Sequence, residues 1–170
     1  MRTVIAACVL FTFAASVDAQ AQDKKFVSKD GKFEAKFPLE PMTESKKVGD
    51  STMVSTAVET KGVGYMVIYA DLPAGAAKAK AEDILAGGEK GLVDDFKATV
   101  TKSTPTMFGK DKLPARDVTA EVVIEKMVLR LRLKLVVVNG RLYQVIAIGT
   151  KESIVSKDVD TFFESFEIVK

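Results

Sequence analysis

The chain has 170 residues, enough for one domain with a buried core and too few for two domains of ordinary size. Its 25 Lys and Arg against 23 Asp and Glu leave a net charge of +2, too small for a molecule-wide field of the kind that attracts nucleic acids or membranes. The chain contains no histidine, no tryptophan and a single cysteine, Cys8. We therefore expect one domain and no nucleic-acid partner.

The N-terminal sequence "MRTVIAACVLFTFAASVDAQAQ" has one basic residue, an apolar run over residues 4–17 and small residues at two candidate cleavage sites. This pattern is typical of a secretory signal peptide. We expect a signal peptide over residues 1–19, with cleavage there or after residue 21, a linker over 20–25 and a single domain over 26–170. The protein would then be secreted or periplasmic in a bacterium, with no stable membrane span.

Two alternatives for this segment remain open. One is an uncleaved membrane anchor, although the apolar run is short for a span. The other is acylation, because "IAAC" around Cys8 resembles the lipobox of bacterial lipoproteins.

Cleavage of the signal peptide would also remove Cys8, and with it every thiol and any possible disulfide. A chain that also lacks histidine has neither a histidine base nor a cysteine-histidine zinc site. An enzyme would need paired carboxylates, a Ser-Lys arrangement or an oxygen-ligated metal. Asp94 and Asp95 are adjacent carboxylates, but neighbouring helical residues diverge by about 100°. We expect a non-enzymatic protein, with no catalytic residue, no metal site and no cofactor.

The first half of the domain predicts two hairpins and a helix. "FVSKDGKFEAKFP" has two apolar runs around Asp30-Gly31, and "TMVSTAVETKGVGYMVIYADL" has two around Lys61-Gly62. Between residues 76 and 97 the apolar residues change to a helical period. The residues on its apolar side are Ala81, Ile84, Leu85, Gly88, Leu92 and Phe96. The lack of a side chain at Gly88 would allow close approach to a sheet.

The second half predicts three consecutive antiparallel strands and a helix. Leucines alternate with cations in "VLRLRLKL", and Asn139-Gly140 is a strong hairpin signal. In "SKDVDTFFESFEI", Ser156 is the expected N-cap. The predicted core stripe of this helix is Val155, Val159, Phe162, Phe163 and Phe166. Asp158 and Asp160 resemble a metal motif, but side chains two residues apart on a helix diverge and cannot share an ion.

Arg130, Arg132 and Lys134 stand two residues apart and would project from one face of the sheet. A two-residue turn at Asn139-Gly140 places the small residues Gly149, Ala147 and Val145 opposite them. Such a stripe can receive an anionic ligand or an acidic partner surface. Tyr143 is predicted on the same face. These four residues are the candidate site.

A structural interpretation of the same stripe remains open. If the preceding hairpin turns at Glu125-Lys126, then Glu121 faces Arg130 and Asp117 faces Lys134. The stripe would then be a neutralised outer face, with Arg132 alone unpaired.

The order of these elements resembles the family of the photosystem II extrinsic protein PsbP and the Ran-binding Mog proteins. The resemblance rests on "DGKFEAKFP", "LPARD", "RLYQVIAIG" and the C-terminal "FFESFEI", and covers residues 26–169. It implies an α+β fold in which helices flank an antiparallel sheet as an α-β-α sandwich. It also implies a non-catalytic, accessory role. No site residue can be transferred, because the metal sites of the plant proteins involve histidine.

Composition and resemblance together favour an exported accessory domain that binds a protein partner in the cell envelope or outside the cell. The alternative is a secreted or periplasmic carrier of a small anionic or amphipathic ligand, since helix-covered sheet faces can enclose a pocket.

Overall fold

The computed structural model describes residues 25–49 and 51–169. The expected signal peptide and Cys8 lie outside the described residues. Within the described ranges, no helix is long and apolar enough to cross a membrane.

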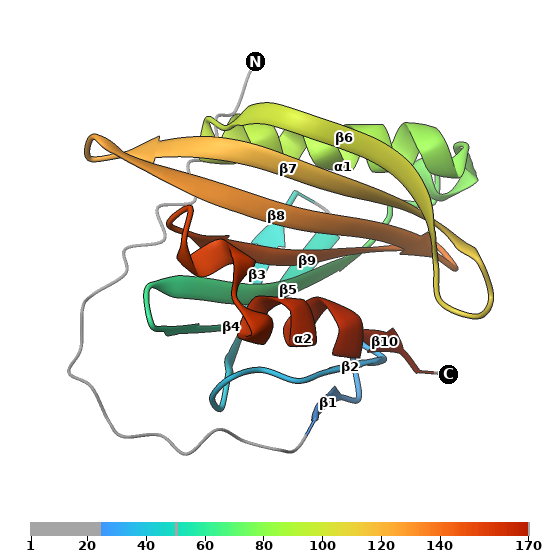
Figure 1. Ribbon diagram of the computed structural model, residues 1–170. Coiled ribbons are helices and arrows are strands. Elements are labelled where there is room, and N and C mark those ends of the chain that lie inside the picture. Colours follow the sequence, from blue (N-terminus) through green and yellow to red (C-terminus); the bar gives the residue numbers. More distant parts are fainter. Residues whose placement is uncertain (1–24, 50, 170) are drawn as a thin grey trace.

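The described chain forms ten strands, two α-helices and two short 3-10 helices (Figure 1). The strands are β1 (Phe26–Ser28), β2 (Phe33–Ala35), β3 (Met42–Val48), β4 (Ser51–Thr60), β5 (Val63–Asp71), β6 (Thr99–Phe108), β7 (Leu113–Ile124), β8 (Met127–Val138), β9 (Arg141–Gly149) and β10 (Glu167–Ile168). The helices are η1 (Ala76–Lys78), α1 (Ala81–Phe96), η2 (Ser153–Val155) and α2 (Lys157–Ser165).

Seven strands form one antiparallel sheet in the order β3-β4-β5-β9-β8-β7-β6. A second sheet has the order β1-β2-β10, and it joins the two ends of the described chain. Three tight turns of the large sheet have two residues each with positive φ, which matches the right-handed twist of the strands. They are Lys61-Gly62, Glu125-Lys126 and Asn139-Gly140.

One face of the large sheet is covered by α1 and is aliphatic. Leu85 and Leu92 of α1 are buried against Leu131, Leu133 and Leu135 of β8. At Gly88 the helix lies so close to the sheet that an added Cβ would be 2.9 Å from the Leu142 side chain. The close approach predicted for this glycine is therefore present.

The opposite face is covered by α2 together with the small sheet, and it is aromatic (Figure 1). Phe162 of α2 contacts Phe37 and Tyr65, with ring centroids 5.0 and 5.4 Å apart. Phe166, predicted within the helix, is buried just after its last residue, Ser165. Val155, predicted in the same stripe, lies in η2 and is 67% exposed.

The predicted α-β-α sandwich is wrong. Strands dominate the described chain, and the two α-helices have only 16 and 9 residues. One face of the large sheet is covered by a single helix, and the other by a short helix together with three short strands. The sheet therefore does not lie between two helical layers. The fold is a β-rich arrangement of a seven-stranded and a three-stranded sheet.

The sandwich was the expectation from the family resemblance, and two strands that the sequence did not reveal make the fold richer in β structure than expected. β3 and β6 are the edges of the large sheet, and nearly all their residues are exposed or half-buried. A strand with no buried face needs no alternation of apolar and polar residues, so its sequence resembles a loop. Pro105 in β6 suits an edge, because proline has no N–H to donate to a neighbouring strand.

Candidate binding groove

The cationic stripe lies on the α2 face of β8, in the register that the sequence predicts. Arg130 pairs with Gly149 of β9, Arg132 with Ala147 and Lys134 with Val145. On the other side the partners in β7 are Glu121, Thr119 and Asp117, in the same order.

Each of the three cations has a carboxylate partner. Arg130 Nη2 is 3.7 Å from Glu121 Oε1, and Lys134 Nζ is 2.9 Å from Asp117 Oδ1. These are the cross-strand pairs of the structural interpretation. Both are partly exposed to solvent, so each contributes at most about 1 kcal/mol to folding.

The expectation that Arg132 is unpaired is wrong. Its Nη1 donates a 2.7 Å hydrogen bond to Asp160 Oδ1 of α2, and its guanidinium lies 4.8 Å from the ring centre of Phe163. The helical pattern of residues 156–168 alone does not show which strand lies beside Asp160, so this partner could not be predicted from the sequence. The ion pair ties α2 to β8 at the edge of the aromatic core.

Beside this contact the middle parts of β6, β7 and β8 are open on this face, whereas Phe108, Ala115 and Val136 farther along these strands belong to the aromatic core. The result is a groove of about 480 Å³, which we call the α2 groove. Its lining residues are Lys102, Thr104, Asp117, Val118, Thr119, Arg132, Leu133, Lys134, Phe163 and Glu164. The α2 groove therefore combines charges of both signs with apolar surface from Val118, Leu133 and Phe163.

Lys102 of β6 differs from the other cations of the α2 groove. It is exposed, and in the described part of the chain its ammonium group has no hydrogen bond or ion pair. Thr104 and Thr119 add hydroxyl groups beside it. The sequence did not identify these residues of β6, because β6 itself was not recognised as a strand.

Tyr143 is not in the α2 groove. Its side chain is 2% exposed, and its hydroxyl donates a 2.8 Å hydrogen bond to the carbonyl oxygen of Gly31. Burial raises the pKa of this phenol above its usual value. Tyr143 holds the β1–β2 loop against the sheet and presents no surface to a ligand. The binding role predicted for Arg130, Arg132 and Lys134 remains a prediction.

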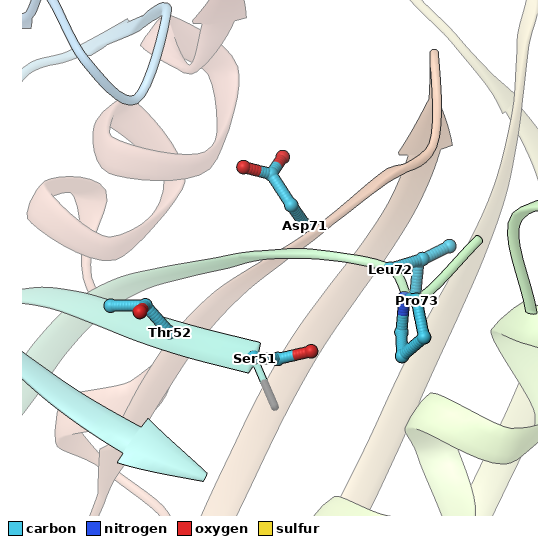
Figure 2. A pocket seen from close by; sticks show the side chains of 5 residues that line it. All are labelled: Ser51, Thr52, Asp71, Leu72 and Pro73. Atoms are coloured by element: carbon cyan, nitrogen blue, oxygen red, sulfur yellow. The ribbon is translucent and has the colours of Figure 1, made fainter. Parts of the chain in front are cut away.

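A second, smaller hollow of about 270 Å³ lies where β4 begins and β5 ends. Figure 2 shows the Asp71 carboxylate pointing away from Ser51 and Pro73 at this hollow. That carboxylate accepts hydrogen bonds of 2.6 and 2.9 Å from Arg141, which hold the pKa of Asp71 below its usual range. Arg141 also donates to the Asp30 carbonyl oxygen and lies over the Tyr69 ring. This group therefore fastens the β1–β2 loop.

The described residues bring together no three side chains of the His, Cys, Asp and Glu types that could hold a metal ion. Asp94 forms an ion pair of 2.9 Å with Lys90 one helical turn earlier, on an exposed face of α1. Arg116, in the "LPARD" segment, is bonded to Glu89 of α1 at 3.2 Å. It therefore connects the helix to β7.

No family model and no curated protein matches the sequence. Among solved structures, the cyanobacterial PsbP (CyanoP) from Synechocystis sp. PCC 6803 is similar with a TM-score of 0.60 and 14% identity, over 92% of this chain and 98% of that one. The protein therefore has a PsbP-like fold.

Two weaker similarities are to a protein of unknown function from Pseudomonas aeruginosa and to a structure from Bacteroides thetaiotaomicron. The first has a TM-score of 0.44 and 8% identity, over 66% of this chain and 85% of that one. The second has 0.48 and 14%, over 86% of this chain and 48% of that one. Scores below 0.5 do not define a common fold.

Proposed function

We propose that the protein is an exported, non-enzymatic accessory domain that binds a protein partner through the α2 groove. Export is inferred from the signal-peptide pattern over residues 1–19, and the non-enzymatic role from the absence of histidine and from the loss of Cys8 with that segment. The PsbP-like fold over nearly the whole domain agrees with the accessory role implied by the resemblance.

The openness of the α2 groove to solvent is the observation that carries the proposal. Cavities that retain small molecules bury most of the ligand surface. In the α2 groove, by contrast, Lys102, Thr104 and Thr119 are exposed to solvent, and one side is the edge strand β6. A polypeptide surface can cover such a groove, whereas a small molecule would remain mostly in water.

The ion pairs of the α2 groove add specificity to this interaction. Asp117 and Asp160 hold Lys134 and Arg132 in fixed positions, so a partner meets preorganised donors and acceptors. Electrostatic complementarity of this kind mainly determines the choice of partner and the rate of association. The expected partner surface carries a carboxylate to meet Lys102 and polar groups to meet the paired charges.

A carrier of small anionic ligands is the second candidate function, and Lys102 is the observation that favours it. An anion bound beside Lys102 would find further donors on Lys134 and Arg132. It would be held by exposed groups of mixed charge, however, so affinity would be low and strongly salt-dependent.

The test uses a matched pair of charge reversals. Lys102→Glu lies in the α2 groove, and Lys78→Glu lies in η1, exposed and outside the groove. The mature protein, immobilised on beads, is exposed to envelope extract of its native host, and the bound material is analysed by native mass spectrometry. We expect one stoichiometric protein with the wild type and with Lys78→Glu, and roughly tenfold less with Lys102→Glu. Equal recovery by both variants would remove the α2 groove as the binding site, and a small-molecule adduct alone would establish the carrier.

A further inference from the structure

The hairpin between β7 and β8 extends beyond both neighbouring strands. The first residue of β6, Thr99, pairs with Glu121, and the last residue of β9, Gly149, pairs with Arg130. Residues 122–129 continue past these positions and pair only with each other. Figure 1 shows the tip of this hairpin at the left, beyond the start of β6. We call residues 122–129 the hairpin arm.

Four large aliphatic residues of the hairpin arm are exposed to solvent. Val123 is 69% exposed, Val128 56%, Met127 57% and Ile124 42%. The other large hydrophobic residues exposed to this degree in the described chain are scattered over β1, β3, β6 and η2. Clustered exposed apolar residues, unlike single ones, indicate an interaction surface.

The exposed residues occupy both faces of the hairpin arm. Val123 pairs with Val128, and this pair lies on the same face as Glu121 and Arg130, which is the α2 face. Ile124 pairs with Met127 on the opposite face. An isolated two-stranded hairpin is only marginally stable in water. Beyond Val122, which is buried in the α1-side core, both faces of the hairpin arm carry exposed aliphatic side chains.

The hairpin arm has a tight turn at its tip and an ion pair at its base. Glu125 and Lys126 have φ values of 48° and 72°, which gives a tight turn that matches the twist of the strands. At the base, Glu121 and Arg130 form the ion pair of 3.7 Å.

The charged residues at the tip indicate which kind of partner can cover these faces: a bilayer, a flat protein surface or a protein cleft. Glu125 and Lys126 form the tip of the hairpin arm, so they would enter the hydrocarbon of a bilayer before the aliphatic residues do. Burial of each charge there would cost about 2–3 kcal/mol. A flat protein surface would cover only one of the two faces. A cleft covers both faces, and groups of opposite charge at its end can pair with the turn.

We infer that the hairpin arm docks in an aliphatic cleft of a protein partner, whose far end carries an acidic and a basic group complementary to Lys126 and Glu125. The inference rests on the proposed function, since both require a protein partner. It adds a second, apolar contact on a different part of the sheet from the α2 groove.

The test places a photo-crosslinking amino acid at Val128 in the mature protein, in the envelope of its native host. The same amino acid at Lys78 serves as the control position. We expect a crosslink from Val128 to one protein, at aliphatic residues identified by mass spectrometry, and none from Lys78 to that protein. Adding Ile124→Ser and Met127→Ser, on the opposite face from Val128, should reduce the crosslinked product about tenfold. All four positions are exposed, and thermal unfolding checks that each variant is folded.

Other outcomes overturn the inference. Undiminished crosslinking in the double variant would show that only one face is covered, which excludes a cleft. Binding to vesicles of phosphatidylethanolamine and phosphatidylglycerol that the double variant loses would identify a lipid surface instead. A third crosslinker at Thr104 separates the two proposals: product from Thr104 without product from Val128 overturns the hairpin arm alone, and no protein product from either position contradicts both.

Discussion

The two faces of the large sheet are built from the same strands but differ in how far they are covered. On the α1 face, the leucines of β8 are covered by a helix and the core is aliphatic. On the α2 face, the core is aromatic over β5 and β9, and the sheet is left open over the middle parts of β6, β7 and β8. The comparison shows that the alternation in "LRLRLK" separates a stabilising face from one that remains available for contact.

The aromatic side depends on α2, and loss of one ring there should have the largest effect. Phe162→Ala removes a side chain with no solvent exposure, in contact with Phe37 and Tyr65. We expect a loss of about 3–5 kcal/mol in the free energy of unfolding, measured in urea. Leu133→Ala on the α1 face is the matched variant, with an expected loss of about 2–5 kcal/mol. A loss below about 1 kcal/mol for Phe162→Ala would mean that α2 is not part of the cooperative core.

The chain's three tyrosines all lie in the α2-side core, and burial raises the pKa of each. The unfolded chain therefore loses these protons first, so stability is present below about pH 10 and falls as the pH rises through the folded-state pKa values. Tyr143→Phe should cost about 1–3 kcal/mol at neutral pH, because the Gly31 carbonyl oxygen loses its donor.

The pH dependence separates the hydrogen bond of Tyr143 from its ionisation. Tyr143→Phe should flatten the alkaline decline in stability, measured by urea unfolding at a series of pH values. Tyr69→Phe is the control, since it removes a buried phenol with a raised pKa and should flatten the decline with a smaller loss at neutral pH. An unchanged alkaline slope in both variants would contradict the assigned burial.

Substitutions at two glycines of α1 test how closely this helix packs on the sheet. Gly91 has no atom within 4 Å of an added Cβ, so Gly91→Ala should stabilise the protein by up to about 1 kcal/mol through helix propensity. Gly88→Ala gains the same propensity but brings its Cβ to 2.9 Å from Leu142, so its net gain should be smaller. Thermal unfolding of the two variants measures this difference. Equal stabilisation would show that α1 does not approach the sheet closely at Gly88.

The smallest effects are expected at the open part of the α2 face. Arg132→Ala removes the 2.7 Å ion pair with Asp160 and should cost about 0.5–1 kcal/mol. Arg130→Ala removes a longer contact of 3.7 Å between two partly exposed groups, and should cost only a few tenths of a kcal/mol. Urea unfolding at low and high salt checks both values. A loss above about 2 kcal/mol in the free energy of unfolding of Arg132→Ala would show that the main role of Arg132 is to stabilise the fold.

The sequence predicted what local patterns determine. Asn139-Gly140 set the register of β8 on β9, and the helical period located α1 and the main part of α2. The register of β7 on β8 is the one that the structural interpretation of the stripe predicted, with a turn at Glu125-Lys126, although those residues are not typical of such a turn. The cations of β8 and two of their three partners were therefore named correctly before the fold was known.

Other features depend on contacts between distant parts of the chain. Asp160 lies 28 residues from Arg132, and nothing in the helical pattern of α2 shows that this helix crosses β8. The edge strands β3 and β6 lack alternation, so the groove residue Lys102 was missed and helices were given too much weight in the fold class. The exposed hairpin arm arises because β6 and β9 are shorter than β7 and β8 at that end, which no local pattern records.

Amide hydrogen exchange tests the central claim, that the open part of the α2 face binds a partner, most directly. Exchange would be compared between the protein purified with its bound protein from the native envelope and the same protein after release in high salt. We predict slower exchange in the complex over β6 and the adjoining part of β7, around Lys102 and Thr119, with little change in α1. Protection confined to α1, or unchanged exchange throughout β6 and β7, would contradict the account.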